Sequence, residues 1–340
     1  MHMSDALLSP VVGLGFHAAS AGLLGATARR AAREDGYERR LPTMGVLGAF
    51  VFAAQMVTFA IPGTGSSGHL AGGTLLAILL GPSAAFLVMA SVVTVQALVF
   101  ADGGLLALGC NVFNLGFWPA FVGILLYRRA VRAWSGPGGV LLGAVASSVV
   151  SLELGALGVV LQTFLSGRSE MPLREMALLM AGVHLPIAVV EGVVTAGVVR
   201  AVRRLAPDRV EGATSRDSPR VPVLAGLAGA ALFLATVAAS FASTRPDGLE
   251  WSLSRALGAA QPAQHATGIG AWLHGLQRHL AVLPGYAFRG GERRPGLDQG
   301  TATSGVLGTI LVACVVVLVG AVSVLSRRGV RSGRARAPPP

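Results

Sequence analysis

The sequence predicts an all-α polytopic membrane protein: a bundle of about seven helices, followed by a two-helix hairpin that encloses an external loop. Hydrophobic residues make up 53% of the 340-residue chain. Charged residues make up only 13%, well below the roughly 25% of a soluble domain. In addition, the chain contains a series of apolar runs of about 20 residues, the length that crosses a bilayer as a helix.

The apolar runs define the expected helices in chain order. We expect helices at residues 8–28, 43–61, 69–80, 84–100, 105–127, 140–165, 176–199, 221–241 and 303–325. The third run is short and glycine-rich, which favours a helix packed inside the bundle or a partly re-entrant course.

A polar, Pro-containing stretch at residues 206–220 divides the chain. Residues 1–205 are expected to form one membrane domain. Residues 221–326 form a second, two-helix domain, whose external loop spans 242–302. The basic tail at 327–340 is expected to be disordered in the cytoplasm. This division is typical of two fused membrane subunits.

All 27 basic residues are Arg, and the net charge is +11. The charge lies in short runs between apolar segments, whereas a nucleic-acid-binding protein would gather it on one face among aromatic residues. We therefore predict lipid and protein partners and no nucleic acid. The Arg-rich connections alternate with connections at 63–68 and 101–103 that carry none. The positive-inside rule then predicts a multi-pass protein of the bacterial cytoplasmic membrane with an external N-terminus.

The first two residues, Met1 and His2, form a potential metal chelate. The Met1 α-amine, the deprotonated backbone nitrogen of His2 and its imidazole can close on one ion in roughly one plane. A fourth nitrogen would complete a square, the geometry that suits Ni(II) or Cu(II) better than Zn(II). His69 follows a Gly/Ser-rich loop and is expected to open a helix on the external face, so it is the candidate fourth ligand.

Three further polar residues, Asp102, Asn111 and Asn114, are expected on the same side. The two Asn residues lie three positions apart and so share a helix face. They could hydrogen-bond the metal-bearing loop, or they could join helices to one another. The sequence leaves both roles open.

Three ionisable residues within apolar runs, Glu153, His184 and Glu191, support an alternative function. A stand-alone proton-coupled carrier of metal or another small solute could use them as a relay. Packing or docking to a partner subunit is the simpler interpretation. The sequence has no HExxH motif or other catalytic spacing, so we expect no enzyme activity and no cofactor. A chain without Lys also has no P-loop, so any energy from ATP must come from a separate subunit.

Four spaced blocks resemble the CbiM/NikM substrate-binding components of energy-coupling factor transporters. They are MHMSDALLSP at 1–10, GHLAGG at 68–73 with LLGP at 79–82, QALVFADGGL at 96–105 and NVFN at 111–114. The likeness covers about residues 1–205. The later segment PDGLEWS at 246–252 is similar to the small CbiN/NikN subunit, here joined to the same chain.

The resemblance implies a transported Ni(II) or Co(II) ion held by Met1, His2 and His69. It also implies a transmembrane coupling subunit and cytoplasmic ATPase subunits as partners, and a link to nickel enzymes or to cobalamin synthesis. Many members carry Ile-Pro-Asp-Gly where this chain has MSDA at residues 3–6. This difference leaves the ligands intact and favours nickel weakly.

Overall fold

The computed structural model describes the chain except for residues 1, 168–171, 206–220, 258–267, 291–297 and 336–340. Within the described part, helices dominate and the strands are confined to one short hairpin. Seven of the described helices are long and apolar enough to cross a membrane. The predicted all-α polytopic class is therefore confirmed.

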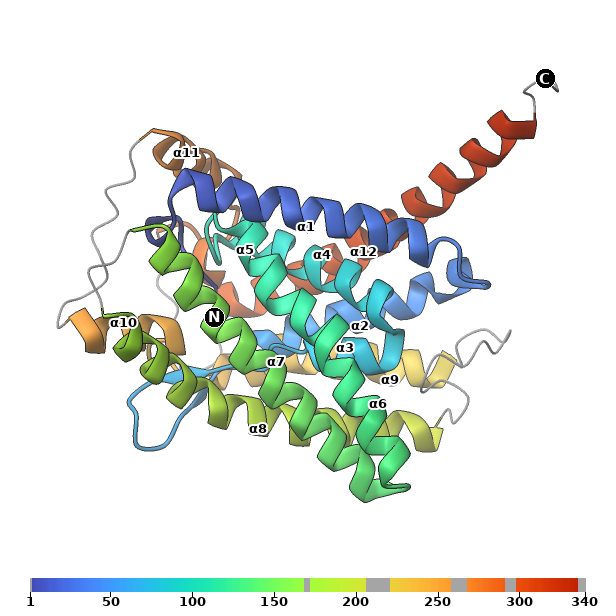
Figure 1. Ribbon diagram of the computed structural model, residues 1–340, viewed down its shortest axis with the longest axis horizontal. Helices are drawn as coiled ribbons and strands as arrows, with labels where there is room; N and C mark the ends of the chain where they lie inside the picture. The colour runs from blue at the N-terminus through green and yellow to red at the C-terminus, as the bar shows by residue number, and fades with distance from the viewer. Residues whose placement is uncertain (1, 168–171, 206–220, 258–267, 291–297, 336–340) are drawn as a thin grey trace.

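The first domain contains the seven expected helical segments in order (Figure 1). They are α1 (Pro10–Ala31), α2 (Tyr37–Gln55), α3 (Gly73–Leu80), α4 (Pro82–Phe100), the continuous helix made of α5 (Leu108–Val112), η2 (Phe113–Gly123) and α6 (Ile124–Ala133), then α7 (Pro137–Leu165) and α8 (Leu173–Leu205).

Burial separates central helices from lipid-facing ones. Of the most apolar window of α4, 83% is buried inside the protein, against 17% for α1. From Met44 to Gln55 every residue of α2 is buried or nearly so, with Gly45 and Gly48 facing another helix. Thus α2 and α4 form the centre, and apolar side chains of α1 such as Val11 and Leu14 face outward.

Two expected helix boundaries in the first domain were wrong. The helix expected over 43–61 ends at Gln55, and residues 59–60 form strand β1 (Phe59–Ala60) instead. It pairs antiparallel with β2 (Ser67–Gly68). The β-branched Val57 and Thr58 and the nearby Pro62 disfavour a continued helix. The helix expected from His69 begins only at Gly73, so His69 lies in the connection that follows β2.

The fifth segment departs from regular α-helix. Residues Phe113–Gly123 form π-helical turns that contain Pro119. Proline lacks a backbone N–H and cannot keep the regular hydrogen-bond ladder, which accounts for the irregular turns. Such turns often occur at functional sites, and this one carries Asn114.

The second domain packs against the centre of the first. It consists of α9 (Val221–Thr236), η4 (Ala238–Phe241) and α12 (Gln299–Ala335), and both α9 and α12 contact α2. Gly48 of α2 lies against Val312 and Val316 of α12, so a small residue there allows the close approach. The structure extends α12 to Ala335, past the expected end at 325 and into the tail expected to be disordered.

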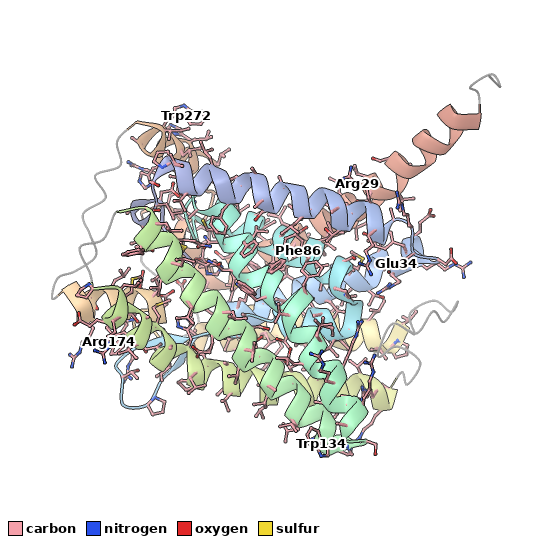
Figure 2. The ribbon with its side chains drawn as sticks, in the orientation of Figure 1. Arg29, Glu34, Phe86, Trp134, Arg174 and Trp272 are labelled. Carbon is pink, nitrogen blue, oxygen red and sulfur yellow. The ribbon has the colours of Figure 1, made fainter. Side chains whose placement is uncertain are left out.

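The segment between α9 and α12 is not a simple loop. It contains α10 (Gly248–Leu257), α11 (Ile269–Leu280) and η5 (Pro284–Tyr286). In Figure 1, α10 and α11 lie at the same end of the bundle, where α1 begins after η1 (Asp5–Leu7). We call this end of the bundle, where the N-terminal segment lies, the site end. Figure 2 shows Arg29, Glu34 and Trp134 at the opposite end, where the Arg-rich connections of the first domain lie.

Candidate metal site

The N-terminal segment is fixed to the bundle through Met3. The Met3 backbone N–H donates to Asn111 Oδ1 at 2.8 Å, and Asn111 Nδ2 donates back to the Met3 carbonyl at 3.2 Å. The Gly104 N–H donates to the same carbonyl at 2.9 Å. Because Met3 is fully buried, these bonds hold the chain next to His2 in a single register.

Asp5 adds a second attachment. Its Oδ1 accepts a hydrogen bond from the Ala107 N–H at 3.0 Å. Burial raises the pKa of Asp5, while this backbone donor acts in the opposite direction. A Cβ atom at Gly104 would collide with Asp5, so only glycine permits this close approach. The ADGG stretch at 101–104 therefore lets the N-terminal segment pack closely against the bundle.

The attachments bring His2 against His69. The two imidazole rings stack with centroids 5.6 Å apart and planes 21° apart. On its other side His2 Nδ1 lies 3.4 Å from Asp102 Oδ1. The buried Nε2 of His2 has no hydrogen-bond partner among the described residues, which is unusual for a buried polar atom.

The surroundings of His69 leave one ring nitrogen available. Its Nδ1 lies 3.1 Å from the carbonyl of Leu70, and a carbonyl can only accept, so Nδ1 carries the proton. Burial, together with nearby positive charge that includes His2, lowers the pKa of His69 to about 4. At neutral pH the ring is therefore uncharged, and its Nε2 presents a lone pair suitable for a metal ion.

A buried polar chain anchors the connection that carries His69. Glu191 Oε2 accepts from the Ala71 N–H at 2.6 Å, and Gln55 Nε2 donates to the Ala71 carbonyl at 2.7 Å. Gln96 Nε2 in turn donates to Gln55 Oε1 at 2.6 Å. These contacts tie the residues after His69 to α8, α2 and α4, so Glu191 positions the loop.

The second domain reaches the same loop. The Ser67 N–H donates to the Pro246 carbonyl at 2.8 Å, and Thr58 exchanges two hydrogen bonds with Ser243. The PDGLE segment is thus paired with strand β2, two residues before His69. The sequence predicted that the external loop of the second domain lies near the metal-bearing face, but it did not predict the pairing of this segment with β2.

A small cavity opens beside His69. Its lining includes Gly68, His184 and Asp247. Partial burial acts to raise the pKa of Asp247, but nearby positive charge and the Glu250 backbone N–H outweigh it and lower the pKa to about 2. The second domain therefore brings a negative charge to the edge of the site.

Tyr286 is a further contributor that the sequence did not indicate. Its hydroxyl donates to Asp102 Oδ2 at 2.6 Å, and its ring stacks on Phe100 with centroids 4.8 Å apart. Tyr286 has a φ of 63°, in the left-handed region that a bulky residue seldom occupies. The preceding Gly285 was the one local sign of a tight turn.

The remaining predicted residues have separate surroundings. Asn114 exchanges two hydrogen bonds with Gln162 of α7, at 2.8 and 3.0 Å, and so joins helices; its Nδ2 also lies 4.0 Å from the Met3 sulfur. His184 Nδ1 faces the carbonyl of Met180 in its own helix. No hydrogen bond or ion pair joins any two of Glu153, His184 and Glu191. The structure thus does not link these three residues into a continuous relay.

Among the described residues, no group of three or more His, Cys, Asp and Glu side chains is arranged to hold a metal ion. The imidazoles of His2 and His69 do meet at this end of the bundle. Met1 itself lies outside the described residues.

The apolar helical bundle, with a nitrogen-rich site at one end, defines a multi-pass membrane transport protein. The family model for the cobalt uptake substrate-specific transmembrane region (CbiM) matches residues 2–209. A PDGLE domain model matches residues 221–325. The chain belongs to the CbiM family and is a cobalt/nickel transport component of the CbiM/NikM type with a fused PDGLE domain.

Similar proteins share both the arrangement and the fold. A putative fused nickel transport protein NikMN of Archaeoglobus fulgidus is 31% identical over 92% of this chain and 95% of its own length. The cobalt transport protein CbiM of Sorangium cellulosum is 31% identical over 60% of this chain and 86% of its own. A truncated transition metal transporter of known crystal structure is 30% identical, with a TM-score of 0.54, and covers 60% of this chain and 99% of that one.

Proposed function

We propose that the chain is the substrate-capture component of an ATP-driven energy-coupling factor importer, and that it binds Ni(II) or Co(II) at the external face of the membrane. The observation that carries this proposal is the stacking of His2 on His69 at 5.6 Å, with Met3 held in register by Asn111. This contact brings the N-terminal segment against the loop that carries His69.

The proposed ligands are four nitrogens: the Met1 α-amine, the His2 backbone nitrogen, the His2 imidazole and His69 Nε2. Within His2, only Nδ1 can close a six-membered ring with the metal and the backbone nitrogen of the same residue. This Nδ1 lies 3.4 Å from Asp102 Oδ1. Metal capture would therefore exchange the Asp102 contact for a metal bond. The resulting square of nitrogens favours Ni(II) over tetrahedral Zn(II).

Nickel is the favoured substrate of the two. The fused relatives from Archaeoglobus fulgidus, Lactiplantibacillus plantarum and Rhodobacter capsulatus are all named nickel transport proteins. The Sorangium cellulosum protein named for cobalt aligns with 60% of this chain. The fused arrangement thus accompanies nickel in the names of these relatives.

ATP hydrolysis requires other subunits, because the chain has no Lys and therefore no Walker lysine. We propose a transmembrane coupling subunit and a pair of cytoplasmic ATPase subunits. The Arg-rich connections lie opposite the site end, so the positive-inside rule puts the site outside and the ATPase side at the Arg-rich end.

Uptake of radioactive nickel in cells tests the proposal. Cells that express the chain with its coupling and ATPase subunits should accumulate nickel. Replacement of the catalytic Glu of the ATPase subunits by Gln should abolish uptake without changing metal binding to this chain. Uptake by the chain alone that collapses with a protonophore, and that Glu191→Gln removes, would instead establish the proton-coupled carrier.

A further inference from the structure

Helix α11 carries an apolar stripe that no described part of the chain covers. Ile269, Trp272, Leu276 and Leu280 recur at spacings of three and four residues, so they share one helix face. Trp272 is 64% exposed, and Leu280 is 45% exposed. An isolated exposed apolar residue needs no explanation, but an aligned stripe on a short helix does.

A different face of α11 holds it to the bundle. Gly270 and Gln277 are buried, and Gln277 Nε2 donates to the carbonyls of Ala97 at 2.9 Å and Gly103 at 2.7 Å. At 100° per residue this face is centred roughly a quarter-turn from the apolar stripe. The stripe therefore points sideways past the bundle, neither into it nor directly away from it.

These hydrogen bonds also set the depth of α11 along the bundle. Ala97 lies in the last turn of α4, which ends at Phe100, and Gly103 follows just beyond. Helix α11 also contacts η1, immediately before α1 begins at Pro10. Both α1 and α4 are candidate membrane spans. The helix is thus held at the level where the spans end, which is the depth of the membrane–water interface.

The stripe continues a surface that must face lipid. Val11 and Leu14, in the first turns of α1, are 82% and 51% exposed, and α1 is the outermost helix on that side (Figure 1). Figure 2 shows Trp272 on the outer side of the molecule, near the end of the bundle where α1 begins. The apolar surface therefore runs from α1 onto α11, as expected if both helices face the interior of the membrane.

The polar face of α11 fits lipid headgroups. The helix contains Arg278 and two His residues and no acidic residue. Arg289 lies at its C-terminal end and donates to the carbonyls of Ala281 and His279. Cationic side chains above an apolar stripe, with a Trp at the boundary, are typical of a helix that lies in the membrane interface.

We propose that α11 is an interfacial helix that embeds Ile269, Trp272, Leu276 and Leu280 in the leaflet at the site end. Its partner is the lipid surface, with anionic phosphates beside Arg278. The chain continues from α11 to Leu283, whose N–H donates to the Val99 carbonyl, and then to Tyr286 on Asp102. Membrane contact by α11 therefore stabilises the segment that touches the metal site. This proposal is independent of which metal the protein carries.

A nitroxide scan along α11 tests the proposal. The full chain carries Cys314→Ala, while buried Cys110 remains; labelling of this background shows whether Cys110 reacts. Single variants Ile269→Cys, Leu276→Cys, Ala271→Cys and Arg278→Cys are labelled and reconstituted in phosphatidylethanolamine/phosphatidylglycerol vesicles. We expect oxygen, which partitions into lipid, to relax the labels at 269 and 276 most strongly. Chromium oxalate, confined to water, should relax those at 271 and 278.

Two outcomes of the scan would overturn the proposal. Chromium oxalate access at 269 and 276 equal to that at 271 would place the stripe in water. Exclusion of both reagents from the stripe would show that protein covers it, and spin–spin broadening would identify that protein as a second copy of this chain.

A second measurement avoids labels altogether. Tryptophan fluorescence of the unmodified chain in the same vesicles is quenched by lipids brominated near the headgroup. Trp272→Phe should remove a strongly quenched component, whereas Trp251→Phe, at a residue packed against the core, should not. Equal quenching of the wild-type chain and the Trp272→Phe variant would contradict membrane contact by α11.

Discussion

The hydroxyl of Tyr286 donates a 2.6 Å hydrogen bond to Asp102, 184 residues away in sequence. The other oxygen of Asp102 faces His2 Nδ1. A residue of the second domain is therefore connected, through one carboxylate, to a proposed metal ligand at the start of the first. Because the proposed chelate uses the same Nδ1, Asp102 holds this ring only until the metal binds.

Tyr286→Phe should lower nickel affinity by about fivefold, the equivalent of one hydrogen bond of about 1 kcal/mol, because Tyr286 fixes Asp102 in the turn whose Gly104 N–H holds Met3. The substitution removes the hydroxyl and keeps the ring stacked on Phe100. Isothermal titration of the purified chain measures the affinity. Tyr127→Phe is the matched control, because Tyr127 accepts from Arg203 far from the site. Equal affinities of Tyr286→Phe and wild type would show that Asp102 needs no support from Tyr286.

Extension of the N-terminus by one residue should abolish high-affinity metal binding. The added residue converts the Met1 amine into an amide and moves the chelate out of register with His69. The same residue added after Pro340 serves as the control and should leave binding unchanged. Native affinity in the N-terminally extended chain would rule out the proposed donor set.

His69→Ala should weaken nickel binding by at least about 100-fold, the upper end of the cost of losing an orienting residue, without eliminating it. The three-nitrogen chelate of the N-terminus remains, and water takes the open position. The d–d absorption should shift because a nitrogen ligand has been replaced by oxygen. An unchanged spectrum would mean that the fourth ligand lies elsewhere.

Asn111→Leu should release the N-terminal segment. It leaves the buried Met3 N–H without its acceptor, at a cost of about 1–3 kcal/mol, and it frees His2 from its register. Both thermal stability and nickel affinity should fall. Asn114→Leu breaks the pair with Gln162 instead and removes only a long contact with the Met3 sulfur at 4.0 Å, so it should lower stability and leave affinity nearly unchanged. Equal losses of affinity in the two variants would count against a special role for Asn111.

Truncation after Ala206 should leave a chain that binds metal but transports poorly. All proposed ligands lie within residues 1–69, whereas the second domain holds the loop through Ser67 and Thr58. Without these bonds, the population of open and closed loop conformations changes. Nickel uptake with the coupling and ATPase subunits measures transport, and equilibrium titration measures binding. Undiminished uptake would show that the second domain is dispensable.

Gly248→Val is a gentler form of the same test. A Cβ atom at this position would lie 2.7 Å from Val183 and 3.1 Å from His184, so the larger side chain should push the PDGLE segment away from α8. Gly226→Val, at a position with open space, is the control. We expect reduced uptake and retained binding for Gly248→Val alone.

The helical class and the order of helices followed from the sequence, because about 20 consecutive apolar residues leave a chain few choices in lipid. The sequence also indicated Met1, His2 and His69 as donors, because their chemistry is local to each residue. Helix ends were less predictable. The β-hairpin at 59–68 depends on pairing between strands and with the second domain, and no periodicity in the sequence records that pairing.

Tertiary structure alone decided which residues meet. Asn111 and Asn114 look equivalent in sequence, yet Asn111 bonds the Met3 backbone, whereas Asn114 pairs with Gln162 and reaches only the Met3 sulfur. Tyr286 and Asp102 carry no shared pattern, and only the packing of α12 and α9 on α2 brings the second domain over the site. The sequence by itself determined the chemistry available to this protein. Long-range contacts determined where that chemistry is assembled, because the hydrophobic pattern specifies burial and leaves the identity of each neighbour to packing.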